Sequence, residues 1–211
     1  STSSSRAENS GRSGEAADVD AVIISTVSHF KQTPSLAVEV AAALGCESPA
    51  AFDISAACAG FSYGVAMGDS LVRTGAARHA LVIGVETLSR LTDLNDRSTA
   101  FLFSDGAGAA VIGPSDKPAI GPVVWGSDPE AATVIETPDW SDTDAYEGTP
   151  KIYMEGAKVF RWATTFIADK ARECLDVAGL APEELDVFIP HQANNRITDS
   201  MLRHLKLPEN V

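Results

Sequence analysis

The chain's first apolar run reads Val19-Asp20-Ala21-Val22-Ile23-Ile24-Ser25-Thr26. It is short, rich in β-branched residues and free of the apolar–polar alternation that marks a half-exposed strand. Such a run predicts a strand buried on both faces, which is the usual setting of a strand in a parallel sheet. The stretch Leu185-Asp186-Val187-Phe188-Ile189-Pro190-His191 has a similar pattern. This weak echo suggests that the fold contains two related halves.

Working outward from this run, strand and helix patterns alternate along the chain. Residues 35–44 are Ala-rich and apolar at helical spacing, and Gly45 ends the helix that they predict. The further elements that we expect are strands at residues 51–54, 80–85 and 107–112 and a helix of small residues at 58–72. A β-α-β-α-β order with buried strands predicts an α/β fold with a mainly parallel sheet.

The later part of the chain is less regular. Residues 114–150 hold six of the 11 Pro residues together with several Gly and Asp residues, and we interpret them as a strand at 120–125 followed by a long irregular excursion. Between Val159 and Ala178, apolar residues recur at helical spacing and would form one face of a helix, so we predict a long helix there. A strand at 187–190 and a helix at 195–205 then follow. We expect residues 1–15 to be disordered or non-native, with one half at 16–150 and the start of another at 151–211.

Composition excludes several classes of function. With 16 basic and 29 acidic residues, the net charge of −13 disfavours non-specific nucleic-acid binding. No apolar run reaches the length of about eighteen residues that a membrane span needs, and residues 1–14 lack the apolar core of a signal peptide. The cysteines stand at wide spacings with no CxxC pair. This pattern disfavours a disulfide framework or a metal site and favours reduced thiols in the cytoplasm.

The strongest candidate for chemistry is the thiol in Ala56-Ala57-Cys58-Ala59-Gly60. It lies between a predicted strand and a predicted helix of small residues, so we expect it at the helix N-terminus. There the helix dipole and the free backbone N–H groups favour the attacking thiolate. The same N–H groups can stabilise an oxyanion that forms on acyl transfer. On these residues alone, a buried structural cysteine remains an alternative.

A second candidate is His191, which follows the strand predicted at 187–190. Ligand sites in α/β proteins lie at the carboxyl ends of strands. A neutral imidazole there could donate a hydrogen bond to developing negative charge or act as a base, although a loop histidine that caps a helix is an alternative. The Gly-rich segment 105–110 superficially looks like a dinucleotide loop. Because a β-branched run follows it, we predict a tight turn without nicotinamide binding.

Four motifs together carry a resemblance to a known family. They are Asp53–Phe61, Arg97–Ala110, Met154–Ala163 and Pro190–Ile197. In this order they resemble segments of the β-ketoacyl-acyl-carrier-protein synthase III family, whose actinobacterial members look most similar. The resemblance covers residues 18–211. It implies a thiolase-like fold with two related βαβ halves and mainly parallel sheets.

The resemblance also implies a reaction that initiates type II fatty acid synthesis. Cys58 would accept a short acyl group from acyl-coenzyme A, and His191 would assist the decarboxylation of malonyl-acyl-carrier protein. The enolate that forms would then attack the acyl-Cys58 carbonyl. The family implies no metal and no cofactor beyond these substrates, and it implies a homodimer in the cytoplasm.

Further residues receive roles from the resemblance alone. These are Arg97 near the coenzyme A adenine, Asn194 beside the histidine, Gly156 and Phe160 along the substrate channel, Thr33 near the partner subunit's acyl pocket and Arg196 at the carrier-protein docking surface.

The sequence also departs from the family pattern. Family members carry an asparagine in a Gly-Asn-Thr-Ser-type loop downstream of the histidine, and an N-terminal tryptophan that packs on coenzyme A. Neither is present between Ser1 and Val211, so we expect the chain as given to be incomplete for activity. Two other readings stay open. One is a priming ketosynthase or acyltransferase of polyketide synthesis, and the other is an inactive remnant that dimerises or binds carrier protein.

Overall fold

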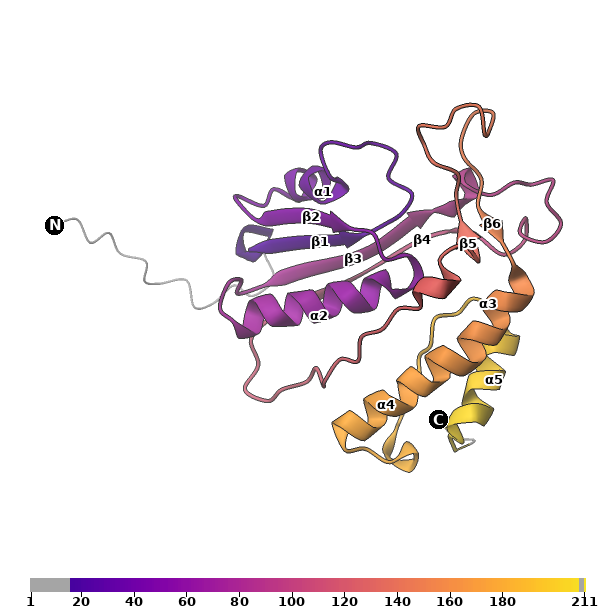
Figure 1. The fold of residues 1–211 in the computed structure, drawn as a ribbon. Helices are drawn as coiled ribbons and strands as arrows, with labels where there is room; N and C mark the ends of the chain where they lie inside the picture. The colour runs from indigo at the N-terminus through magenta and orange to yellow at the C-terminus, as the bar shows by residue number, and fades with distance from the viewer. Residues whose placement is uncertain (1–15, 209–210) are drawn as a thin grey trace. The chain divides into compact units, whose positions relative to one another are not determined.

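A computed structural model describes residues 16–208 and residue 211, and the chain divides into two compact units (Figure 1). The first unit comprises the chain up to Gly84 together with Gly108–Pro114, and the second comprises Val85–Ala107 and Ser115–Val211. The disorder expected of residues 1–15 falls outside the described residues. The compact units are not the two thiolase-like halves, whose boundary near residue 150 stays a prediction.

The first unit is built on a sheet whose strands run in the order β2-β1-β3-β4. β1 pairs in parallel with β2 on one side and with β3 on the other. Every residue of β1 is buried, so the strand predicted from the opening apolar run is confirmed. The elements are β1 (Ala21–Ser25), α1 (Leu36–Leu44), β2 (Ala50–Ile54), α2 (Gly60–Arg73), β3 (Ala80–Thr87) and β4 (Asp105–Ile112).

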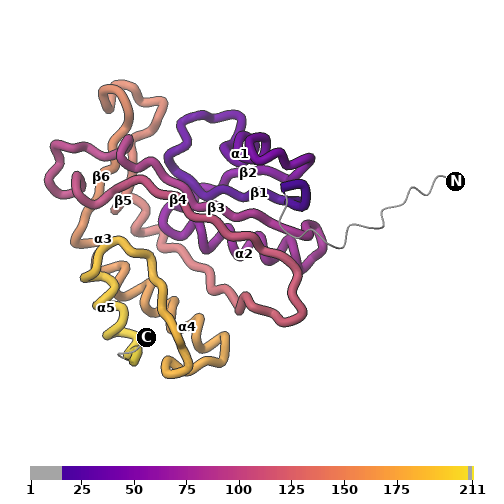
Figure 2. Tube along the Cα trace, turned by 180° about the vertical axis from the view of Figure 1, so that it is seen from behind, coloured from indigo at the N-terminus to yellow at the C-terminus, as the bar shows by residue number. Residues whose placement is uncertain are grey.

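Helices cover both faces of β1, which explains why its sequence does not alternate. The backbone N–H groups at the start of α1 donate to the Asp53 carboxylate, and Asp53 pairs in register with Ile24. The start of α2 packs instead against Ser25. Successive strand residues point to opposite faces, so α1 and α2 lie on opposite sides. Accordingly, α2 lies in front of the strands in Figure 1 and behind them in Figure 2.

The small residues of α2 allow a close approach to the sheet. Gly60, Gly64 and Gly68 lie four residues apart and share one helix face. A Cβ atom at Gly64 would lie 2.7 Å from Cγ1 of Val82, which is too short for an unstrained contact. The predicted helix of small residues is therefore confirmed, although α2 begins at Gly60 and the 3-10 helix η2 (Ala57–Ala59) precedes it.

The second unit is mainly helical. Its long helix consists of α3, a π-helical segment and α4 in direct succession, as the apolar periodicity predicts. Ala168 of this helix forms a core with Ile197 and Met201 of α5, and Phe188 packs against that core. The elements are η3 (Leu88–Arg90), η4 (Pro129–Ala131), β5 (Ile135–Glu136), β6 (Tyr153–Met154), α3 (Gly156–Trp162), η5 (Ala163–Ile167), α4 (Ala168–Ala178), η6 (Pro182–Glu184) and α5 (Asn195–Leu205).

Three local predictions are wrong. Residues 120–125 and 187–190 form no strand. A strand needs a neighbour for its backbone hydrogen bonds, and neither segment belongs to a sheet of the described residues. The Gly-rich segment 105–110 is no tight turn but lies in β4. Its glycines have no positive φ, so they extend like any other strand residue. Within the described residues, no helix combines the length and the apolar character needed to cross a bilayer.

Candidate active site

The Cys58 thiol lies on a short turn between β2 and α2. The turn is closed by the Ala59 N–H, which donates to the Ala56 carbonyl oxygen at 3.1 Å, and Cys58 is exposed. Ala57, the residue before Cys58, has a φ of +43°. This left-handed conformation costs an alanine roughly 1–2 kcal/mol. Strain of this kind persists only where the surrounding structure imposes it, and it clusters at functional sites.

A close contact between Gly60 and Ser25 follows this turn. A Cβ atom at position 60 would lie 1.6 Å from Oγ of Ser25, so the first turn of α2 rests directly on the end of β1. Ser25 is buried. Cys58 stands two residues before a helix of 14 residues. The Gly60 N–H donates to the Ala57 carbonyl oxygen, and the dipole of α2 favours negative charge near the thiol.

His191 lies in an extended segment of the second unit, between η6 and α5. Although the residue as a whole is exposed, the protein around the ring partly desolvates the imidazole and lowers the pKa of His191. Desolvation disfavours the charged form. The neutral imidazole is therefore the main form near neutral pH, as a hydrogen-bond donor or base requires.

The turn after His191 is fixed by Asn194. Its Oδ1 accepts a hydrogen bond from the Ile197 N–H at 3.1 Å, which makes Asn194 the N-cap of α5. Capping by His191, the alternative left open by the sequence, is therefore wrong. α5 is held on α4 by His204, whose Nε2 lies 2.8 Å from Oδ1 of Asp169. The segment that carries His191 thus leads into a firmly packed helix.

The other predicted site residues are distributed over both units. Thr33 is exposed before α1 in the first unit, which also carries Cys58. Arg97 is exposed between β3 and β4 in the second unit. The second unit brings together His191, Asn194 and Arg196 on one segment, with Arg196 exposed on the first turn of α5. Gly156 begins α3 and Phe160 lies on the same helix.

Two residues with a clear local role were missed by the sequence reasoning. Asp53 accepts hydrogen bonds from the N–H groups of Leu36 at 2.7 Å and Ala37 at 2.8 Å. A carboxylate inside a short apolar strand is a signal that could have identified this cap, because such a group needs hydrogen-bond partners. The second residue is Asp96, which organises the loop that carries Arg97.

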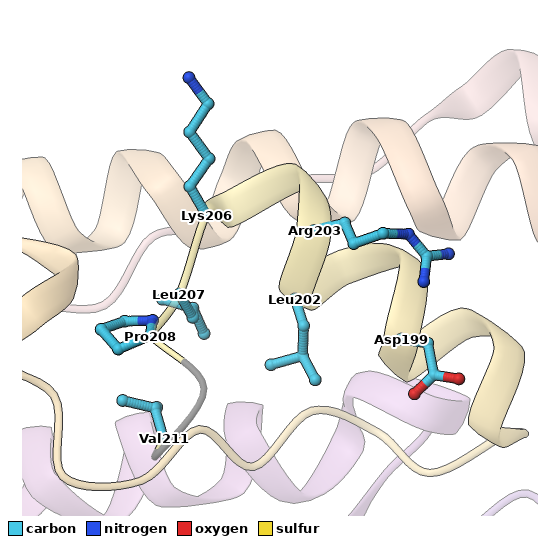
Figure 3. Close-up of a pocket in the computed structure, with 7 residues that line it drawn as sticks. All are labelled: Asp199, Leu202, Arg203, Lys206, Leu207, Pro208 and Val211. Atoms are coloured by element: carbon cyan, nitrogen blue, oxygen red, sulfur yellow. The ribbon is translucent and has the colours of Figure 1, made fainter.

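A surface hollow of about 320 Å3 lies at the C-terminal end of α5 (Figure 3). Arg203 and Lys206 extend away from each other at its rim. The lining residues are Asp199, Leu202, Arg203, Lys206, Leu207, Pro208 and Val211. None of the predicted catalytic residues lines it. Among the residues with described positions, no group of three or more His, Cys, Asp or Glu side chains is arranged to hold a metal ion.

Comparison with known proteins assigns the family. Residues 52–129 match the family model of 3-oxoacyl-acyl-carrier-protein synthase III, and residues 175–211 match the model of its C-terminal part. The chain belongs to the 3-oxoacyl-acyl-carrier-protein synthase III family. Three of the four predicted motifs, Asp53–Phe61, Arg97–Ala110 and Pro190–Ile197, lie inside the matched ranges.

Curated members of the synthase III family from actinobacteria are similar over most of the chain. The beta-ketoacyl-acyl-carrier-protein synthase III of Streptomyces glaucescens is 57% identical over 199 residues, which cover 93% of this chain and 60% of that protein. The synthase III 1 of Streptomyces coelicolor is 53% identical over 210 residues, which cover 93% of this chain and 61% of that protein. The chain thus spans about three fifths of the length of these relatives.

Solved structures agree with the predicted thiolase-like fold. The priming beta-ketosynthase of the R1128 polyketide pathway is 44% identical with a TM-score of 0.89, over 93% of this chain and 60% of that one. The synthase III of Thermus thermophilus is 36% identical with a TM-score of 0.83, over 92% of this chain and 61% of that one. The α/β fold class predicted from the sequence is confirmed.

Proposed function

We propose that the whole protein is a condensing enzyme that joins a short acyl group from acyl-coenzyme A to malonyl-acyl-carrier protein, with loss of carbon dioxide. One observation carries this proposal. The strained turn at Ala57 and the contact of Gly60 with Ser25 hold an exposed cysteine at the start of a helix. Membership of the synthase III family supports the same chemistry.

In the first half-reaction the Cys58 thiolate attacks the carbonyl carbon of the acyl thioester. A bond forms between the Cys58 sulfur and that carbon, while the carbon–sulfur bond to coenzyme A breaks. Coenzyme A leaves as a thiolate and takes up a proton from solvent. Backbone N–H groups of the Cys58 turn stabilise the oxyanion formed on the way, and the acyl group remains on Cys58.

In the second half-reaction malonyl-carrier protein loses carbon dioxide, and the electron pair of the broken carbon–carbon bond forms a thioester enolate. The neutral imidazole of His191 donates a hydrogen bond to the enolate oxygen. The enolate carbon attacks the acyl-Cys58 carbonyl, a new carbon–carbon bond forms, and the Cys58 thiolate is released. No redox step occurs, so the reaction needs no cofactor beyond its two substrates.

The remaining family roles belong to the same proposal. Arg97 contacts the nucleotide of coenzyme A, Gly156 and Phe160 line the acyl channel, and Arg196 contacts the acidic carrier protein. Asn194 stands beside His191 while its oxygen caps α5. We place Thr33 near the acyl pocket of the partner subunit, which requires a homodimer.

The whole reaction tests the proposal. The protein is mixed with acetyl-coenzyme A and malonyl-carrier protein, and mass spectrometry follows the carrier protein. A 3-ketobutyryl-carrier protein should form, and the Cys58→Ala variant should form none. Absence of any 3-ketoacyl-carrier protein with acetyl, isobutyryl and other short acyl donors would refute a condensing function and favour an inactive protein that dimerises or binds carrier protein.

A second candidate function is priming of polyketide synthesis, favoured by the similarity to the R1128 priming ketosynthase. Both functions use the same cysteine chemistry and differ in the carrier protein. Competition between the carrier proteins of fatty acid and polyketide synthesis for one acyl-enzyme distinguishes them. Preference for the fatty acid carrier supports the first candidate, and preference for the polyketide carrier supports the second.

A further inference from the structure

The loop between β3 and β4 presents an exposed arginine, Arg97. Among the residues that the structure describes, its guanidinium makes no hydrogen bond or ion pair. Two carboxylates, Asp93 and Asp96, lie close to it in sequence.

Asp96, the residue before Arg97, has both carboxylate oxygens engaged in hydrogen bonds within its own loop. Oδ1 accepts hydrogen bonds from the Ser98 N–H at 2.8 Å and from Ser98 Oγ at 2.7 Å. Oδ2 accepts a hydrogen bond from Thr99 Oγ1 at 2.7 Å. The Ser98 hydroxyl, followed by that of Thr99, lowers the pKa of Asp96, so the carboxylate stays charged and bound to its own loop.

The same contacts fix the backbone on both sides of Arg97. The Asp96 carbonyl oxygen accepts from the N–H groups of Thr99 at 3.2 Å and of Ala100 at 2.9 Å. Thr99 is only 1% exposed, so its side chain anchors the loop in the second unit. Arg97 therefore lies on a loop whose backbone is fixed by hydrogen bonds, and its charged guanidinium is exposed. A planar guanidinium in this state suits phosphate oxygens and the flat face of a base.

We infer that Asp96 is a positioning residue for the nucleotide part of the acyl-coenzyme A substrate. It holds the backbone around Arg97 and directs its own carboxylate toward the hydrogen-bond donors of that loop. This inference rests on the proposed function, in which Arg97 contacts that nucleotide. Asp96 itself touches neither the substrate nor the reacting atoms.

The test compares two acyl donors that differ only in the nucleotide. Acylation of Cys58 is followed by intact mass at increasing concentrations of acetyl-coenzyme A or of S-acetylpantetheine, which lacks the nucleotide. Asp96→Ala should raise the half-saturating concentration of acetyl-coenzyme A about tenfold, the effect of losing one charge-assisted hydrogen bond. The half-saturating concentration of S-acetylpantetheine should not change. Arg97→Ala should show the same selectivity, and the double variant should be no worse than Arg97→Ala.

A matched control exists in the same chain. Asp139 makes the same turn, with its Oδ1 accepting from the Ser141 N–H and Ser141 Oγ, both at 2.7 Å. No arginine lies between Asp139 and Ser141, so Asp139→Ala should leave both half-saturating concentrations unchanged. Asp96→Asn keeps an acceptor for the Ser98 N–H and should fall between the wild type and Asp96→Ala. It also serves as the test variant if Asp96→Ala fails to fold.

Two results would overturn the inference. Equal losses with both donors would make Asp96 a general structural residue. A double variant that is clearly worse than Arg97→Ala would show that Asp96 acts independently of Arg97. Wild-type protein that takes an acetyl group from neither donor would instead refute the proposed function.

Discussion

Gly60 lies so close to Ser25 that position 60 has no room for a side chain. A Cβ atom there would lie 1.6 Å from Oγ and 2.8 Å from Cβ of Ser25. The first residue of α2 thereby rests on the last residue of β1, and the Cys58 turn is held at the end of the central strand.

Substitution of Gly60 by alanine should therefore destabilise the protein. Overpacking of this kind costs about 1–3 kcal/mol in the free energy of unfolding, which denaturant titration measures. Ser25→Gly in the same chain should recover part of the loss, because the nearest remaining atom, the Cα of residue 25, lies at 3.9 Å. Gly156→Ala is the control for stability, since its Cβ would meet only Met154 Cε at 3.8 Å. Equal stability of Gly60→Ala and the wild type would contradict the account of this contact.

Asp53→Ala should weaken the attachment of α1 to the sheet. The variant removes the acceptor for two backbone N–H groups, and loss of a helix cap costs about 0.5–2 kcal/mol. Ser35→Ala is the matched control, because Ser35 is the N-cap residue of α1 and yet makes no side-chain cap hydrogen bond. Thermal unfolding should separate the two variants. If Ser35→Ala proves as damaging as Asp53→Ala, the cap has been assigned to the wrong residue.

The sequence predicted the regular elements of this fold well for a physical reason. Strand β1 is buried on both faces and the three helical patterns α1, α2 and α5 are strongly periodic, so local hydrophobicity reflects the final environment. The failures at 120–125 and 187–190 have the opposite cause. A short apolar run becomes a strand only beside a partner, and the presence of a partner depends on distant parts of the chain. Similarly, the glycines at 106 and 108 are compatible with a turn or a strand. The pairing of β4 with β3 determines that they form a strand.

The types of residue in the candidate site were predictable from the sequence. The contacts that hold those residues in place were not. A cysteine before a helix of small residues and a histidine after an apolar run both indicate chemistry. The close contact of Gly60 with Ser25 and the cap that Asp53 supplies to α1 depend on residues far apart in sequence. Only the folded structure brings them together, so periodicity and motif spacing carry no information about them.

The two half-reactions should respond differently to His191→Ala. His191 is proposed to stabilise the enolate, whereas the helix terminus is proposed to favour the Cys58 thiolate. Condensation should fall by about 10²-fold or more, the scale of losing one oxyanion donor. Acylation of Cys58 should survive better, and single-turnover mass spectrometry measures each step separately. Equal loss of both steps would identify His191 as the base that the thiol requires.

The proposed role of His191 also predicts a pH dependence. Partial desolvation lowers the pKa of this imidazole, so the neutral form persists to lower pH than for an ordinary histidine with a pKa of about 6.5. Release of carbon dioxide from malonyl-carrier protein should therefore decline only below that pH. The profile is measured from about pH 5 to 8, with His191→Asn as the control that should lose this titration. A midpoint at or above the ordinary value would contradict the neutral-donor role.

The most direct test of the central claim is the site of acylation. The protein is incubated with a short acyl-coenzyme A, and peptide mapping locates the acyl group among Cys46, Cys58 and Cys174. The account predicts one acyl group on Cys58, and it predicts no labelling of Cys58→Ser, because a serine hydroxyl without an adjacent base is a far weaker nucleophile near pH 7. Acyl groups confined to Cys46 or Cys174, with Cys58 unmodified, would contradict it.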